Sequence, residues 1–209
     1  MRGPRGASVC VIGGGFAGLN TALGLAERGL RDVVLVESQQ VGFGASGRNG
    51  GFVFGGFSRG EGRLLDDLGP DRSRMLYRGT TDAVELIRQR TDRYAIDCDR
   101  VDAGVLWATW FRDPDVLRDR QRLLAERFDA PWEWMPRSQL RELVHSHRYH
   151  DGLFEPQAFH FHPLKYARGL AAAALAQGVS IHEQTPAIKL DRQGAAWHVR
   201  TPDGVVEAE

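Results

Sequence analysis

The sequence has few cysteines, no long apolar run and no excess of either charge. Its two cysteines, Cys10 and Cys98, are too few for a disulfide framework and fit a reducing compartment. The run Leu170–Ala176 is far too short to cross a bilayer, and the apolar stretch Val9–Ile12 is too short for a signal-peptide core. Basic and acidic residues number 27 each, which argues against a nucleic-acid binder and against an acidic tail. We therefore expect a cytoplasmic globular protein without a transmembrane segment or a nucleic-acid partner.

Glycine is abundant instead, at 25 of 209 residues against a typical ~7%, and it clusters near the start of the chain. The mostly apolar run Ala7–Ile12 predicts a buried parallel strand, and it leads directly into Gly13-Gly14-Gly15-Phe16-Ala17-Gly18. A helical pattern over Leu19–Arg28, a stop at Gly29 and a second apolar strand over Asp32–Glu37 follow. This order of strand, glycine turn, helix and strand is the setting that a dinucleotide-binding motif requires.

Each glycine of the motif has a physical task. Gly13 can adopt the positive φ of a tight turn, Gly15 lets a pyrophosphate approach the backbone, and Gly18 lets the helix lie close to the strand. The helix start at Phe16 and Ala17 offers unpaired N–H groups and a partial positive charge to phosphates. The alternative is that these glycines serve packing only.

Glu37 indicates which nucleotide the motif prefers. It ends the second predicted strand 19 residues after Gly18, where a carboxylate accepts hydrogen bonds from the ribose hydroxyls of adenosine. Its charge would repel a 2′-phosphate, which disfavours NADP.

A second glycine-rich stretch favours FAD over NAD. Seven glycines lie within the fifteen residues from Gly42 to Gly56, too many for a regular helix or strand. A simple NAD half-domain would have an ordinary helix here, whereas this loop can run along a flat ligand. Hydrogen-bond donors, a positive charge and small backbone positions make us expect cofactor contacts at Ala45, Ser46, Arg48, Asn49, Gly50 and Gly51. A flexible linker is the alternative, although phenylalanines interleaved with the glycines are unusual in linkers.

These motifs resemble the FAD-dependent D-amino-acid oxidase (DAO) superfamily and, within it, the γ-glutamylputrescine oxidoreductase-like amine oxidases. The segments Ile96–Asp99 and Asp151–Tyr166 agree with that resemblance. The resemblance implies an α/β fold, with a Rossmann-like FAD-binding domain of the glutathione-reductase-like βαβ type. It divides that domain into residues 1–60 and 155–209, the latter with a β-hairpin, around an inserted α+β substrate-side region at 61–154. It also places a main-chain contact with the adenine near Ala187, where a surface turn is the open alternative.

The resemblance also implies a reaction. A hydride would move from the carbon that bears a neutral amine to flavin N5, and the imine would hydrolyse in water. The substrate would be an amine or an amino acid, and no residue of this sequence is named as catalytic. Family members continue beyond Glu209, so the resemblance suggests a C-terminally truncated fragment that associates with a missing C-terminal half. Such a chain alone would hold FAD weakly, without turnover. A non-catalytic dinucleotide-binding remnant and an NAD-dependent dehydrogenase remain alternatives.

Other patterns are less specific. Five of the seven histidines lie between His145 and His162, but no ligand spacing is complete, so we expect no metal site. The tryptophans Trp107, Trp110, Trp132 and Trp134 could line a hydrophobic pocket, although core packing is the preferred interpretation.

Periodicity predicts the remaining elements. Helices are expected over residues 71–94, from an Asp113 N-cap, from a Ser138 cap to Val144, and over Pro163–Gln177. Strands are expected over Val101–Thr109 and Val179–His182, with a hairpin over residues 196–208.

Overall fold

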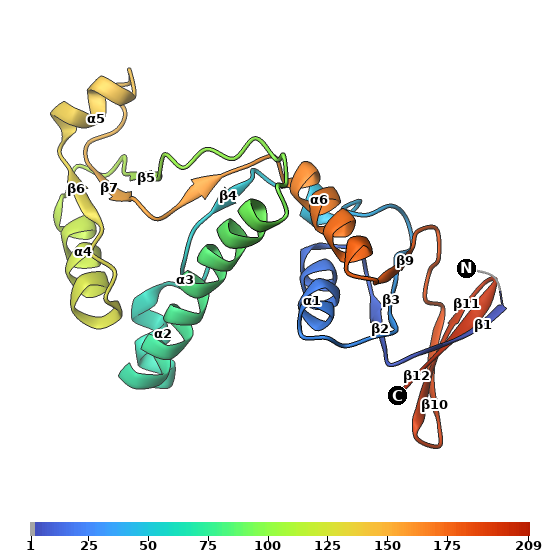
Figure 1. Ribbon diagram of the computed structural model, residues 1–209. Coiled ribbons are helices and arrows are strands. Elements are labelled where there is room, and N and C mark those ends of the chain that lie inside the picture. The colour runs from blue at the N-terminus through green and yellow to red at the C-terminus, as the bar shows by residue number, and fades with distance from the viewer. Residues whose placement is uncertain (1–2) are drawn as a thin grey trace. The chain divides into compact units, whose positions relative to one another are not determined.

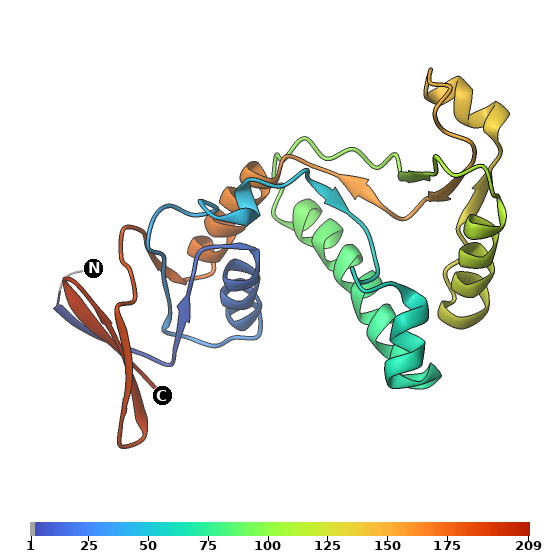
Figure 2. The same ribbon diagram turned by 180° about the vertical axis from the view of Figure 1, so that it is seen from behind.

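The computed structural model describes residues 3–209 and divides the chain into two compact units (Figures 1 and 2). The first unit consists of Met1–Gly50, Thr91–Asp99 and His162–Glu209, and the second of Gly51–Arg90 and Arg100–Phe161. Each unit is described by itself below.

A three-stranded parallel sheet forms the centre of the first unit. Its order is β2-β3-β9, and its strands are β2 (Val9–Ile12), β3 (Val33–Val36) and β9 (Ser180–His182). All four residues of β3 are buried, as expected for a continuous apolar run in a parallel sheet. Two helices, α1 (Phe16–Glu27) and α6 (Pro163–Ala176), pack side by side next to this sheet (Figure 1).

The ends of these helices follow the sequence signals. Gly29 takes a φ of +84°, and its N–H donates to the Ala26 carbonyl at 2.9 Å, which confirms the predicted stop of α1. At the start of α6, His162 Nδ1 accepts a hydrogen bond from the Lys165 N–H at 3.4 Å, and Pro163 occupies the first helical position.

A second sheet of the first unit contains the predicted hairpin. Its order is β1-β12-β11-β10, with strands β1 (Gly3–Ala7), β12 (Gly204–Ala208), β11 (Ala196–Thr201) and β10 (Lys189–Gln193). The prediction of one strand over Ala7–Ile12 is wrong in its bounds, because the chain leaves β1 at Ser8, whose N–H donates to the Asp32 carbonyl at 3.0 Å. The strand β2 is also less buried than predicted, since Ile12 is 52% exposed.

The second unit combines helices with short antiparallel strands. Its sheet has the order β5-β7-β6, and β4 pairs separately with β8. The strands are β4 (Phe52–Val53), β5 (Val105–Ala108), β6 (Glu133–Met135), β7 (Gly152–Glu155) and β8 (Phe159–His160). The helices are α2 (Glu61–Leu68), α3 (Pro70–Arg93, whose last turn belongs to the first unit), α4 (Asp115–Phe128) and α5 (Arg137–Leu143). Their shared core is a cluster of Leu64, Tyr77, Leu117, Leu124, Phe128, Trp132 and Leu153.

Three local predictions for the second unit are corrected. The strand expected over Val101–Thr109 is regular only in β5, with an isolated bridge at Val101. Pro114, not Asp113, is the N-cap of α4, although the Asp113 carboxylate accepts the Asp115 N–H at 3.0 Å. Ser138 lies inside α5, because Pro136 precedes the first helical residue.

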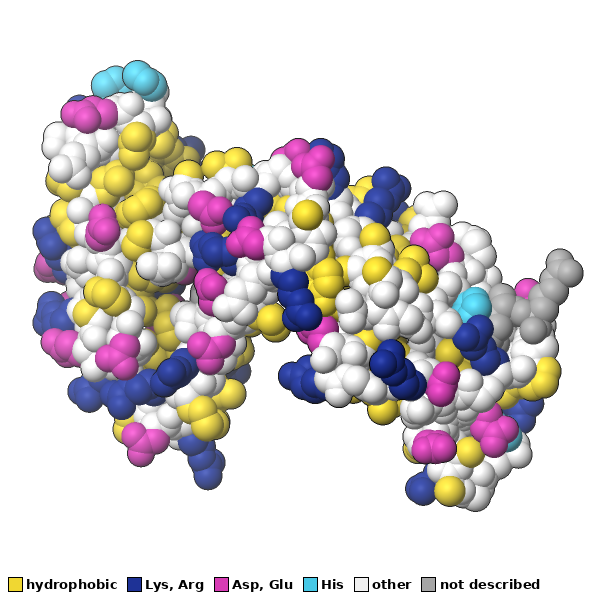
Figure 3. Space-filling view, in the orientation of Figure 1, with side chains coloured by type: hydrophobic (Ala, Val, Ile, Leu, Met, Phe, Trp, Pro, Cys, Tyr) yellow, Lys and Arg dark blue, Asp and Glu magenta, His cyan; other side chains and the backbone are white. Residues whose placement is uncertain are grey.

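Charged side chains of both signs are interspersed on the face in Figure 3, in keeping with the balanced composition. Within residues 3–209, no helix has the length and apolar character needed to cross a membrane.

Candidate dinucleotide-binding site

The glycine turn after β2 is tied to the end of β3. Gly13 has a φ of +106°, and its N–H donates to the Val36 carbonyl at 2.8 Å. The next N–H, that of Gly14, donates to Glu37 Oε2 at 2.6 Å. The sharp turn therefore needs glycine at position 13, as predicted, and it is held at both residues by the neighbouring strand.

Gly18 lets α1 approach the turn closely. A Cβ at this position would collide with the Gly13 carbonyl oxygen and would lie 3.3 Å from Val11 Cγ1. The third glycine of the motif thus has the packing task predicted for it.

The first turn of α1 presents N–H groups at its positive end. The prediction of an unpaired N–H is wrong for Phe16, whose N–H donates to Ser46 Oγ at 2.9 Å. Within residues 3–209, no hydrogen bond is found from the N–H groups of Gly15, Ala17 or Gly18, and no acidic residue lies in the first turn. A Cβ on Gly15 would lie 2.8 Å from Ser46 Oγ, so glycine also keeps this approach open. The helix start can therefore bind an anion.

The glycine-rich loop packs against both the turn and α6. The Gly42 N–H donates to the Gly14 carbonyl at 2.9 Å, and Gly42 has a φ of +73°. A Cβ there would lie 3.0 Å from Leu164 Cδ1 and 3.1 Å from the Ala167 Cβ. The Val41 N–H donates to Glu183 Oε1 at 2.6 Å. These contacts argue against the flexible-linker interpretation.

The predicted residues of the loop do not all meet at the turn. Ala45 and Ser46 belong to the short 3₁₀ helix η1 (Ala45–Gly47), and the Asn49 side-chain amide donates to the carbonyls of both at 3.0 Å. Arg48 instead places its guanidinium 4.3 Å from the centre of the Phe43 ring. Gly50 is exposed, whereas Gly51, with a φ of +74°, begins the second unit and accepts the Phe161 N–H at 3.0 Å.

Glu37 occupies a half-buried position at the carboxyl end of β3. Besides Gly14, it accepts hydrogen bonds at Oε1 from the Gln39 N–H at 2.8 Å and from Ser38 Oγ at 3.1 Å. Because a carboxylate can accept about four hydrogen bonds in all, one further acceptor position remains. Its contact with Gly14 is a structural task that the sequence pattern did not indicate.

The loop after β9 returns to the same edge of the sheet. The Glu37 N–H donates to the His182 carbonyl at 2.9 Å, and the buried Thr185 donates its N–H to the Glu37 carbonyl at 2.8 Å. Ala187 lies two residues further on and is exposed. Sequence reasoning missed Gly14, Gly42 and Glu183, whose only signals were extra glycines and an acid after a returning strand.

The remaining candidates lie elsewhere. Among residues 3–209, no three His, Cys, Asp or Glu side chains gather as metal ligands. Trp132 belongs to the core of the second unit and stacks on Trp107 with ring centres 5.6 Å apart, whereas Trp110 is 57% exposed. The core interpretation therefore holds for Trp132 and not for Trp110.

A parallel sheet, a glycine turn and a helix start open to an anion define a dinucleotide-binding α/β protein. The DAO family model, described as FAD dependent oxidoreductase, matches residues 8–209, and the chain belongs to that family. The predicted FAD cofactor and the mixed α/β fold class are thereby confirmed.

Two curated relatives illustrate the membership. The chain is 37% identical over 209 residues to the gamma-glutamylputrescine oxidoreductase of Escherichia coli (strain K12), covering 96% of this chain and 47% of that protein. It is 34% identical over 201 residues to the probable oxidoreductase OrdL of Haemophilus influenzae, covering 96% and 46% respectively. The chain thus spans about half the length of these relatives.

Solved structures share the fold. The L-amino acid deaminase from Proteus myxofaciens, in complex with anthranilate, superposes with a TM-score of 0.78 at 22% identity and covers 100% of this chain and 45% of that one. The glycine oxidase from Geobacillus kaustophilus gives a TM-score of 0.75 at 22% identity, covering 98% and 54%.

The residues at the turn fit the diphosphate of FAD. Because Gly15 and Gly18 have no Cβ, a diphosphate can approach their backbone closely. Their N–H groups and that of Ala17 have no hydrogen-bond partner among the described residues. N–H donors without partners at the positive end of a 12-residue helix are the donor set that a diphosphate requires.

Proposed function

We propose that this chain binds FAD along the first unit and belongs to an enzyme that oxidises a carbon–nitrogen bond of an amine or an amino acid. The observation that carries the proposal is the start of α1, where glycine and unpartnered N–H groups form a place for a diphosphate. The names of two similar proteins, a gamma-glutamylputrescine oxidoreductase and an L-amino acid deaminase, support the substrate class.

The chain's own residues would bind and orient the cofactor. The N–H groups of Gly15, Ala17 and Gly18 would donate to the diphosphate, and Ser46 Oγ would share the Phe16 N–H with it. The remaining acceptor position of Glu37 would hold a ribose hydroxyl. When bound, FAD supplies the two-electron acceptor for the oxidation.

The other residues predicted at the site complete the proposal. Gly13 shapes the turn, while Arg48, whose guanidinium makes no hydrogen bond among residues 3–209, supplies a positive charge for the diphosphate. The exposed backbone at Gly50 would also contact the cofactor, and the exposed backbone at Ala187 would contact the adenine. Ala45 and Asn49 keep Ser46 in place through the hydrogen bonds of η1.

Titration of the purified chain with FAD, followed by flavin fluorescence, tests the proposal. We expect saturable binding that ADP displaces and that Glu37→Lys abolishes, because a cation then replaces the acceptor of the ribose hydroxyls and the partner of the Gly14 N–H. The matched control, Glu126→Gln, changes an exposed carboxylate on α4 and should leave FAD affinity unchanged. Unaltered affinity in Glu37→Lys, or binding of NADH in place of FAD, would contradict the proposal.

A further inference from the structure

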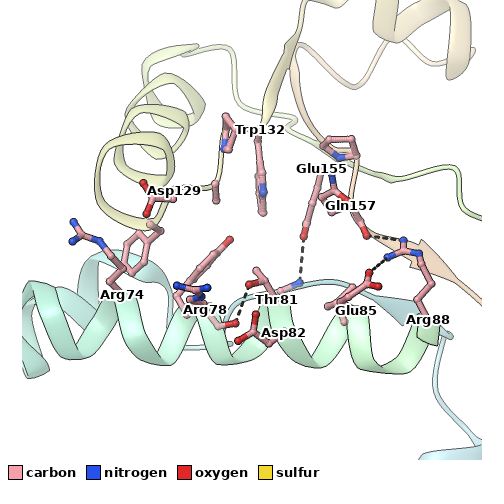
Figure 4. Close-up of a pocket in the computed structure, with 17 residues that line it drawn as sticks. Arg74, Arg78, Thr81, Asp82, Glu85, Arg88, Asp129, Trp132, Glu155 and Gln157 are labelled. Atoms are coloured by element: carbon pink, nitrogen blue, oxygen red, sulfur yellow. Dashed lines mark hydrogen bonds and ion pairs between the residues drawn. The ribbon is translucent and has the colours of Figure 1, made fainter. Parts of the chain in front are cut away.

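The second unit contains a cavity of about 460 Å³ between α3, the end of α4 and the turn after β7. This volume is within the range of small-molecule sites. Its walls include the aromatic side chains of Tyr77, Phe128 and Trp132, each at least nine-tenths buried. Figure 4 shows the Glu155 side chain reaching from its strand toward α3.

Glu155 is a buried acid that is fixed in place but lacks a cationic partner. Its Oε1 accepts the Gly55 N–H at 3.2 Å, and its Oε2 accepts Trp107 Nε1 at 3.1 Å. No cation of the described chain forms an ion pair with it, and the residue is only 5% exposed. The two hydrogen bonds set the direction of the carboxylate and leave a lone pair on each oxygen.

Arg120, a cation whose charge acts on Glu155, is already paired with another carboxylate. Arg120 pairs with Glu61 at 3.0 Å and lies over the indoles of Trp132 and Trp107, 4.9 and 5.1 Å from their centres. Burial raises the pKa of Glu155, against the hydrogen bonds of Trp107 and Gly55 and the charge of Arg120, while Glu61 adds to the rise. A buried carboxylate with this environment is stabilised by any cation that enters the cavity.

Tyr77 provides a second polar group in the same cavity. The residue is 2% exposed, and within residues 3–209 no hydrogen bond to its hydroxyl is found. Burial, with the charges of Glu155 and Glu61, raises the pKa of this phenol, so it is neutral and can accept a hydrogen bond.

We infer that this cavity binds an organic ammonium ion, with the nitrogen between the Glu155 carboxylate and the Tyr77 hydroxyl and the carbon chain against Trp132 and Phe128. A neutral apolar occupant would leave the Tyr77 hydroxyl and the remaining lone pairs of Glu155 without partners, and an anion would be repelled by the charge of Glu155. Aromatic faces add cation–π attraction to an ammonium group. At the edge of the cavity, Arg88 forms ion pairs with Glu85 at 3.2 Å and with Asp102 at 3.1 Å. Arg78 also lies at this edge; it is exposed, and its guanidinium makes no hydrogen bond among residues 3–209.

Titration of the full chain with n-butylammonium chloride, followed by calorimetry and tryptophan fluorescence, tests the inference. We expect saturable binding, with n-butanol and butyrate at least about tenfold weaker, since they lack the charge or carry the opposite one. Glu155→Gln should weaken butylammonium binding about tenfold or more, while Glu142→Gln, a change at an exposed carboxylate of α5, should have no effect. Equal affinity for butanol, or no saturable binding, would overturn the inference.

Two measurements keep the test decisive if Glu155→Gln does not fold. Tyr77→Phe removes only a hydroxyl without a partner and should weaken binding about two- to fivefold without loss of helical circular dichroism. In the wild-type chain, affinity should rise with pH as Glu155 ionises, because only the carboxylate attracts the cation. An affinity that is independent of both changes would refute the site. The inference does not rest on FAD binding, so a failure here leaves the FAD titration unaffected.

Discussion

Gly18 shows how strongly the proposed site depends on a single missing atom. Its hydrogen lies where a Cβ would collide with the Gly13 carbonyl, so the helix and the turn can meet only at a glycine. Ser46 approaches Gly15 in a comparable way, through a hydroxyl that a Cβ would displace. At this scale the sequence motif predicted the task of each glycine, because the task depends on the residue's own backbone.

Replacement of Gly18 by alanine should therefore disrupt the turn. We expect FAD affinity to fall at least about tenfold and the melting temperature to fall by several degrees, because helix and turn must separate to admit the methyl group. Fluorescence titration and thermal denaturation measure the two effects.

Gly79 provides the matched control, since it is a helical glycine of α3 with open space around its Cβ position. Gly79→Ala should stabilise the chain by roughly 0.5–1 kcal/mol with no change in FAD affinity. Equal losses in the two variants would show that the Gly13–Gly18 contact has no special importance.

At the scale of elements, local patterns predicted those whose signal lies within their own residues. The helices α1 and α6, the strand β3 and the β11–β12 hairpin carry apolar runs, a Pro start or a glycine turn in sequence. The strand β1 carries no such pattern, since its residues Gly3–Ala7 are strand only through pairing with Gly204–Ala208. The contact of Val41 with Glu183 was missed for the same reason, because it joins residues 142 positions apart.

The β10–β11 pair carries an ion pair whose contribution to stability depends on pH. Hydrogen bonds from Arg200 lower the pKa of Asp191 to about 2, with further help from the charges of Arg200 and Lys189. A carboxyl with a lowered folded-state pKa stabilises the fold above its unfolded pKa, and that stability is lost as pH falls toward 2.

The difference in urea midpoint between wild type and Asp191→Asn should thus shrink as pH falls from about 4 toward 2. Because the pair is only partly buried, we expect a small effect at any pH. Asp66→Asn on α2, where the carboxylate is exposed and without an ion pair among residues 3–209, should show no such trend. A midpoint difference that stays constant would contradict the assignment.

At the scale of the whole molecule, each unit has its own hydrophobic core. Val34, Val36, Val199 and Val206 form a cluster of the first unit, whereas the aromatic and leucine cluster around Tyr77 belongs to the second. The two proposed ligands would therefore stabilise different sets of backbone amides, because a ligand stabilises the part of the fold that it contacts.

Hydrogen exchange with ADP should reveal this separation. We expect ADP to slow exchange in residues 13–18 and 42–50, where the turn and the loop lie, and to leave residues 77–85 of α3 unchanged. Butylammonium should give the reverse pattern, with protection around Gly55 and in 77–85. Protection of both regions by either ligand would contradict the assignment of one site to each unit.

The pairing of β3 with β9, and of Val41 with Glu183, has a consequence for biosynthesis. On the ribosome the glycine turn and its helix emerge early, but the partners that complete their sheet emerge only after residues 51–161 have been translated. Until β9 has been synthesised, the apolar edge of β3 has no strand to pair with. Contacts between residues so far apart in sequence also form slowly. We therefore expect the parallel sheet of the first unit to be completed only after translation has passed His182.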